Sequence, residues 1–331
     1  MRYTTDGSDP TAASPLYTGP INLTGSTELK ARVFAPGVSA GPVGIGSYVE
    51  LATSSNFGGL DAPNAFSSDL PVIVIENFND GGFNTSALKP AHVKIFEPDP
   101  ETGRTDLNRP PDQFFRAGFR IRGASSAGFP KKQYRVEVWN EDGDQIEVPS
   151  LGLPEEADWI FGAPYVDESL FRNPLVFSIG RDLGLEAPRT RHCEVFLNTG
   201  GGQLESDDYV GVYYVAESIK RDNNRIDIAR LDPSHDSEPE ITGGYIIRHE
   251  ASASEGPRLA GWDHLEVAEP NSITATQLQW ISTFVDDLSV ALNGPTFKDP
   301  VMGYRPFIDV PSFVNTMVIN ELAREQDSYV R

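Results

Sequence analysis

The hydrophobic periodicity of this chain changes along its length, and the change limits the folds it can adopt. Up to about residue 140, short apolar runs alternate with polar residues, which is typical of strands with one buried face. From about residue 158 helical periodicity appears beside further strands, and it dominates the last sixty residues or so. This order predicts an α+β chain that is β-rich first, mixed next and helical last.

The predicted strands are short and are separated by turn residues such as those in DGSDP, TGP and APG. The first group covers residues 2–4, 21–23, 28–34 and 46–51. The second group covers residues 70–77, 92–96, 114–122 and 133–139, with a long Pro-rich loop inside it. The last group covers residues 193–197, 209–217 and 243–250.

Three helices are predicted, over residues 169–183, 275–292 and 310–325. Pro174 cannot donate a backbone hydrogen bond, so the first helix either starts late or kinks there. Asp309 and Pro311 are typical of the start of the third helix. That helix carries a series of apolar side chains expected to form its buried face: Phe313, Val314, Met317, Val318 and Leu322.

Length and composition predict more than one unit. A chain of 331 residues exceeds one average domain. The segment LATSSNFGGLDAPNAFSS resembles a linker in composition. We therefore predict a β module at residues 1–51, a linker at 52–69 and the main domain at 70–331.

Charge and residue usage exclude several classes of function. The formal net charge of −21 argues against nucleic-acid binding, which needs a basic face. No apolar run approaches twenty residues, so no membrane span is expected. Cys193 is the only cysteine, which excludes an intramolecular disulfide and a cysteine metal site, and the histidines lack ligand spacing. We expect a secreted or surface-exposed protein, of which this chain is a fragment because strands begin directly after Met1 and no leader is visible.

The stretch RGASSAGFPKKQYRVEV at residues 122–138 is the strongest candidate for a binding site. Its small residues would let backbone N–H groups approach an anion closely, and its serines add hydroxyl donors. The candidate contacts are Gly123, Ser125, Ser126 and Gly128. An ordinary solvated polar turn explains the same residues, and the spacing of a Walker loop is missing.

One of the two lysines after this turn is expected to reach back to a bound phosphate. Strand alternation makes Lys131 and Lys132 face opposite ways. If Tyr134 and the apolar residues after it face the core, Lys132 shares their side and points inward. We therefore favour Lys132 over Lys131 as the phosphate ligand.

Two carboxylates are further candidates. Glu217 ends the apolar strand VGVYYVAE, where it is either a strand-end charge or a cleft residue. Asp327 follows the last predicted helix in the turn EQDSY, where a carboxylate could act as a general base, although an acidic residue in a turn is ordinary.

Residues 1–51 resemble part of the Ig-like module at the C-terminus of chitobiase-type proteins. The resemblance rests on YTTDGSDPT, SPLYTGPI and LKARVF. It implies a partial β-sandwich that serves as an accessory domain, with carbohydrate binding as the less favoured alternative.

Five motifs in order resemble the spore coat protein H (CotH) kinase family. They are RIRGASSAGFPKKQYRVEV, DESLFRNPLVFSIGRDLGLEAPRT, EVFLN followed by YVGVYYVAESI, GGYIIRHE, and FVNTMVINELAREQDSY. The resemblance covers roughly residues 70–331. It implies a divergent protein-kinase-like fold, with a β-rich N-lobe and a truncated helical C-lobe, that uses ATP with Mg²⁺ or Mn²⁺ to phosphorylate Ser or Thr of an acceptor protein.

The resemblance also implies roles for individual residues. The turn from Gly123 to Gly128 would cover the phosphates, with Lys132 or Lys131 as the phosphate-binding lysine. Arg172 would be the basic residue of the helix behind the nucleotide, and the strand ending at Glu217 would lead into the hinge that holds the base. Asp327 would be the catalytic aspartate that receives or orients the proton of the acceptor hydroxyl.

The metal-binding aspartate of the family is expected beyond Arg331, so we expect residues 1–331 alone to bind nucleotide weakly and to transfer phosphate poorly or not at all. Pro174 also puts the geometry of the Arg172 helix in question. The alternative function is a non-catalytic extracellular adhesion or scaffold protein. A polysaccharide-processing enzyme is not supported, because no pair of carboxylates stands out.

Overall fold

The computed structural model describes residues 1–56, 59–249 and 256–325. The chain divides into two compact units. The first comprises Met1–Leu170 with Thr190–Glu217, and the second comprises Phe171–Arg189 with Ser218–Arg331. Among the described residues, no helix is both long enough and apolar enough to cross a membrane.

The first unit begins with a three-stranded antiparallel sheet in the order β1-β2-β3. Its strands are β1 (Arg2–Thr4), β2 (Thr27–Arg32) and β3 (Val43–Tyr48). The prediction of a strand at residues 21–23 was wrong, because this short run between the turns at Gly19-Pro20 and Gly25 pairs with no strand. Strand β3 begins and ends three residues earlier than the strand predicted at residues 46–51.

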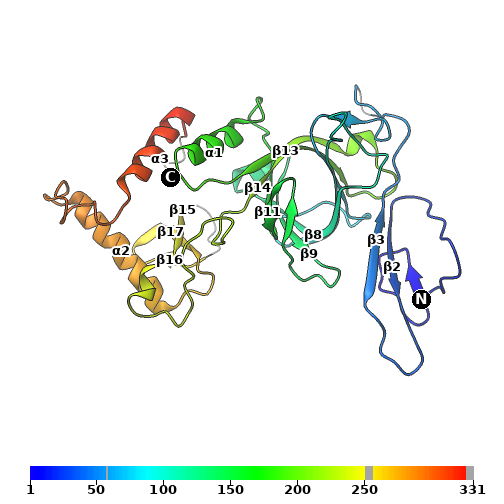
Figure 1. Ribbon diagram of the computed structural model, residues 1–331, viewed down its shortest axis with the longest axis horizontal. Coiled ribbons are helices and arrows are strands. Elements are labelled where there is room, and N and C mark those ends of the chain that lie inside the picture. Colours follow the sequence, from blue (N-terminus) through cyan, green and yellow to red (C-terminus); the bar gives the residue numbers. More distant parts are fainter. Residues whose placement is uncertain (57–58, 250–255, 326–331) are drawn as a thin grey trace. The chain divides into compact units, whose positions relative to one another are not determined.

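A closed barrel of seven strands forms the body of the first unit (Figure 1). The strand order is β12-β14-β13-β5-β6-β8-β9, and β9 closes the barrel by pairing with β12. Only the β13–β5 pair is parallel. The strands are β5 (Val72–Glu76), β6 (Lys89–Phe96), β8 (Gln113–Arg122), β9 (Gln133–Trp139), β12 (Asp158–Gly162), β13 (Thr190–Asn198) and β14 (Tyr209–Glu217).

Side-chain alternation along these strands fills the barrel interior. Ile73 and Ile75 of β5 point inward with Phe119, Tyr134 and Trp159, in one buried cluster. Residues 158–162 were predicted to begin the helical part of the chain, and this was wrong. The run DWIFG is short and apolar, and it forms β12 between β9 and β14.

The segment predicted as a linker packs against the barrel. Ala52 and Phe66 are buried, and the Ala52 amide donates to the Leu204 carbonyl oxygen at 2.9 Å. Phe66 lies in a second core cluster with Val74 and Phe196 on the outer side of β5 and β13. Two small antiparallel pairs complete the first unit: β4 (Ser67–Ser68) with β7 (Thr105–Asp106), and β10 (Val148–Ser150) with β11 (Leu153–Glu156).

The described part of the second unit contains three α-helices and a three-stranded antiparallel sheet in the order β15-β17-β16. The sheet consists of β15 (Ile246–His249), β16 (Arg258–Leu259) and β17 (Trp262–Glu269). The helices are α1 (Arg172–Asp182), α2 (Ala275–Asn293) and α3 (Val310–Ala323). Helix α2 places Ile281 in one buried cluster with Leu259 and Val267 of the sheet.

The helix predictions are largely confirmed, but the buried face of α3 is not. Helix α1 starts late, with Pro174 in its first turn, and Asp309 caps α3 through the Ser312 amide. Helix α3 turns Asn315 and Ile319 toward α1, and the Asn315 amide donates to the Leu183 carbonyl oxygen at 2.9 Å. The residues that were predicted to form the buried face are each 52–68 % exposed: Phe313, Val314, Met317, Val318 and Leu322. The periodicity identified the helix, and the contact with α1 uses a different side of it.

Glu76 makes the barrel sensitive to pH. Its side chain is 1 % exposed at the end of β5, and burial raises its pKa to about 7, although the Phe78 amide donates to one of its oxygens. Between the ordinary value of 4.5 and about 7, the unfolded state is therefore ionised while the folded state is not. We expect the unfolding free energy to fall by about 2–3 kcal/mol as the pH rises through that window, because of this one group.

Urea titrations of wild type and Glu76→Gln from pH 4.5 to 8 test this prediction, because the variant should lack the fall in unfolding free energy. Parallel curves for the two proteins would contradict it.

Candidate functional site

The candidate turn connects β8 to β9 in the first unit. Ser125–Gly128 form one short 3-10 turn, and the Phe129 amide closes it by donating to the Ser126 carbonyl oxygen. Phe129 then stacks on Tyr165, with ring centroids 5.3 Å apart. Both ends of the turn are therefore held, at β8 by the sheet and at Phe129 by an aromatic contact.

Gly123 and Gly128 have different roles in this turn. Gly123 has φ +105°, and a Cβ there would lie 2.1 Å from the Ser126 hydroxyl oxygen. It is therefore required by the conformation of the turn itself. A Cβ at Gly128 would meet nothing within 4 Å. Ser125 and Gly128 are exposed and Ser126 is half-buried, so the outer surface of the turn is open to a ligand.

Lys131 and Lys132 have different surroundings, as predicted, but Lys131 and not Lys132 is the one that contacts the barrel core. The Lys131 ammonium donates to the Val212 carbonyl oxygen and lies 4.7 Å from the ring centroid of Tyr213, a residue of the barrel core. Lys131 thus takes the inward position that was expected for Lys132. Strand pairing of β9 begins only at Gln133, so the alternation used for the prediction does not extend to the lysines. Burial lowers the pKa of Lys131.

Lys132 lies beside the turn. Its ammonium donates to the Ala127 carbonyl oxygen at 2.8 Å, and its own carbonyl oxygen accepts from the Tyr213 hydroxyl at 3.0 Å. The backbone of Lys132 is therefore fixed to β14, while its charge is at the open turn. Its role as a phosphate ligand stays a prediction, and this position suits it better than that of Lys131.

Gly211 is a residue that the sequence interpretation missed. It has φ +93° and lies where the β13–β14 register shifts, and a Cβ there would lie 3.3 Å from the Lys131 ammonium nitrogen. This irregularity lets the ammonium reach β14. The signal was present in the sequence, since an isolated glycine in the alternating run YVGVYYVAE is typical of a β-bulge.

The remaining predicted site residues do not all lie in the first unit. Glu217 is the last residue of β14 and is buried opposite Trp159 of β12. Arg172 begins α1 and belongs to the second unit. Asp327 lies outside the described residues. The structure therefore brings together the turn, Lys131 and Lys132, whereas Glu217 is placed at a strand end and is not a surface charge.

No group of three or more His, Cys, Asp or Glu side chains suited to a metal ion occurs in the described part of the chain. Cys193 of β13 is a free and buried thiol, and burial raises its pKa.

Comparison with protein families identifies the chain. The sequence model described as CotH kinase protein matches residues 119–331, which is most of the chain. The chain belongs to the CotH kinase protein family. Residues 1–44 match the chitobiase/beta-hexosaminidase C-terminal domain. A comparison with curated proteins found no match.

The CotH match begins within β8, although the barrel begins at β5. Strands β5 and β6 precede the matched segment, yet they pair with β13 and β8 and complete the barrel. The matched CotH segment therefore depends on strands that neither family match covers.

Proposed function

We propose that this chain is a CotH-type protein kinase, which transfers the γ-phosphoryl group of ATP to Ser or Thr of an acceptor protein. One observation carries the proposal. A short turn with an open outer surface and an ammonium group beside it lies inside the segment that matches the CotH kinase family.

The residues of the turn fit a phosphate group chemically. Backbone N–H groups of a tight turn form a concave set of donors that suits an anion. The absence of a side chain at Gly128 allows close approach, and the hydroxyl of Ser125 is on the exposed side of the turn. On binding, the Lys132 ammonium would exchange the neutral Ala127 carbonyl oxygen for a charged phosphate oxygen, which is the stronger partner.

The other residues would position the lysine and the reacting groups. Lys131 and Tyr213 tie the start of β9 to β14, which limits the movement of Lys132. ATP supplies the phosphoryl group, and Mg²⁺ or Mn²⁺ would neutralise its charge. Asp327 would accept or orient the proton of the acceptor hydroxyl, and Arg172 and the strand ending at Glu217 would border the nucleotide. These assignments come from the family resemblance.

The two families also suggest where the protein works. CotH and chitobiase-type C-terminal domains favour an extracellular or spore-coat protein. With a net charge of −21, the surface would favour a basic or neutral acceptor protein over an acidic one.

The test measures phosphate on the intact protein. The polypeptide, including whatever natural sequence follows Arg331, is incubated with ATP and Mg²⁺ or Mn²⁺ and a basic model protein, and both proteins are weighed by mass spectrometry. We expect additions of one phosphate mass for wild type and none for Asp327→Ala. Loss of activity in this variant reports on the chemical step only if its thermal midpoint is unchanged. Equal phosphorylation by wild type and variant would contradict the role of Asp327. No phosphate on either protein, without any effect of ATP on thermal stability, would favour the adhesion or scaffold alternative.

A further inference from the structure

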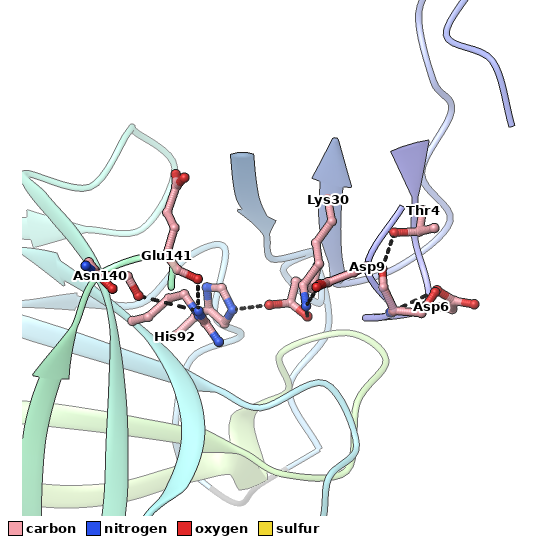
Figure 2. A network of polar contacts seen from close by, with 10 residues as sticks. Thr4, Asp6, Asp9, Lys30, His92, Asn140 and Glu141 are labelled. Carbon is pink, nitrogen blue, oxygen red and sulfur yellow. Dashed lines mark hydrogen bonds and ion pairs between the residues drawn. The ribbon is translucent and has the colours of Figure 1, made fainter. Parts of the chain in front are cut away.

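The N-terminal sheet is joined to the barrel by polar contacts inside the first unit. Glu28 of β2 and His92 of β6 meet with 2.7 Å between Oε1 and Nε2 (Figure 2). Beside them, the Lys94 ammonium donates to the carbonyl and hydroxyl oxygens of Ser47 on β3, at 2.9 and 2.6 Å. Both contacts link the outer face of β6 to the module of residues 1–50.

His92 lies in a closed and largely apolar site. Its residue is 4 % exposed, and its ring lies against Phe78 and Phe114, with centroid distances of 5.2 and 5.6 Å. Within the described residues, its second ring nitrogen, Nδ1, is buried and has no hydrogen-bond partner. The neutral ring with its proton on Nε2 satisfies this arrangement, because that N–H donates to the Glu28 carboxylate and Nδ1 stays a bare acceptor.

Protonation would disturb the site. It would place an N–H on Nδ1, to which none of the described residues is hydrogen-bonded, and a charge in a buried, largely apolar site. Burial accordingly lowers the pKa of His92, although Glu28 acts in the opposite direction, and the nearby charges of Arg116 and Lys94 lower it further. Arg116 cannot offset the charge, because it is itself a cation; its guanidinium donates to the Glu141 carbonyl oxygen at 2.7 Å (Figure 2).

We propose that the Glu28–His92 contact is an acid-sensitive latch, which holds the N-terminal module on the barrel while His92 is neutral and releases it when His92 takes up a proton. Release would let the imidazolium reach water, which the docked arrangement denies it. The latch depends on no kinase activity, so it stands or falls separately from the proposed function.

The other charged groups around His92 do not reverse this direction. On β2, burial acts to raise the pKa of Glu28, but His92 and then Lys30 lower it overall, so Glu28 stays ionised; Lys30 in turn bonds Asp9 at 3.1 Å. On β6, burial lowers the pKa of Lys94 to about 8, so below that pH Lys94 is charged and its bond to Ser47 is kept.

On β5, Glu76 is the register partner of His92, and its pKa is about 7. Its protonation at lower pH stabilises the fold, whereas protonation of His92 destabilises the docked module. The bond of Glu76 to Phe78 and its charge interactions with Asp208 and Lys94 are internal to the barrel, so release of the module leaves them in place.

Hydrogen exchange followed by mass spectrometry tests the latch on the whole chain. Peptides covering β2 and β6 are compared from pH 7.5 to 5, after correction for the intrinsic exchange rate. We expect protection of both peptides to fall as the pH drops below about 6.5, the ordinary pKa of a released imidazole. Protection of peptides from β9 and β14, inside the barrel, should not fall over this range, since protonation of Glu76 stabilises the barrel as the pH drops. The ring-carbon chemical shift of His92 should in addition titrate below about 6.5.

Four variants separate the possible causes. His92→Gln keeps a donor to Glu28 but cannot take up a proton, so its β2 protection should not change with pH. Glu28→Gln removes the charge that favours the imidazolium in the docked state, so its fall should be at least as large as that of the wild type and should not move to lower pH. Glu76→Gln and His264→Gln, the latter at an exposed residue of β17 in the second unit, should keep the fall in β2 protection. Wild-type protection that is constant from pH 7.5 to 5, a fall that persists in His92→Gln, or a fall that Glu76→Gln abolishes would each overturn the latch. If His92→Gln is undocked at every pH, Glu28→Gln decides, and a fall that is smaller than that of the wild type or that moves to lower pH would overturn the proposal.

Discussion

Replacing Phe119 with alanine is expected to lower the unfolding free energy of the first unit by about 3–5 kcal/mol. Phe119 is fully buried in the barrel interior. Its ring stacks on Phe83 at 5.1 Å and meets Tyr134 and Phe161 edge-on at 6.0 and 5.7 Å. These rings come from separate strands and a loop, so the cavity left by the deletion cannot close by the movement of one side chain.

Urea unfolding followed by tryptophan fluorescence measures this loss, because Trp159 belongs to the same core cluster. Phe114→Ala is the matched control. Phe114 lies on the same strand but is 41 % exposed, and its loss should be less than half as large. Equal losses for the two variants would contradict a barrel whose interior is on the Phe119 side of β8.

Replacing Gly128 with valine is expected to weaken ATP binding by about 10- to 100-fold, which corresponds to one lost hydrogen bond to a charged group. A Cβ at this position meets no protein atom within 4 Å, so the variant should keep the thermal midpoint of the wild type. A branched side chain would instead occupy the space between the backbone donors of the turn and the phosphates.

Gly19→Val is the matched control for this experiment. Gly19 also has open space around it, and it lies in a turn of the N-terminal module. Its variant should bind ATP as the wild type does. Gly123→Val is not suitable, because its left-handed backbone and its contact with Ser126 would alter the turn itself. Unchanged affinity in Gly128→Val would remove the turn from the nucleotide site.

Local patterns predicted most elements, and the failures have physical causes. Strands β9 and β14 and the start of α2 match the prediction to the residue, since their alternation or helical period is uninterrupted. Strand β12 was missed, because a buried run of five residues carries no alternation. The packing of residues 52–69 was missed because Ala52 and Phe66 are buried by partners distant in sequence, which local composition does not encode.

The site was predicted in part. The turn and both lysines were identified from residue type, but the exchange of their sides depends on where β9 starts to pair and on the bulge at Gly211. The Glu28–His92 contact lay beyond any sequence pattern, because it joins residues 64 positions apart through the docking of one sheet on another.

A calorimetric titration of the wild-type chain with ATP and Mg²⁺ tests the central claim most directly. Binding of nucleotide precedes phosphoryl transfer, so this measurement does not depend on the acceptor protein or on the catalytic aspartate. We predict saturable binding of one nucleotide per chain, together with a rise in thermal midpoint that Gly128→Val reduces. No heat of binding and no thermal shift at millimolar ATP, with either Mg²⁺ or Mn²⁺, would contradict a nucleotide site in the first unit and leave the turn at Gly123–Gly128 as a polar connection between two strands.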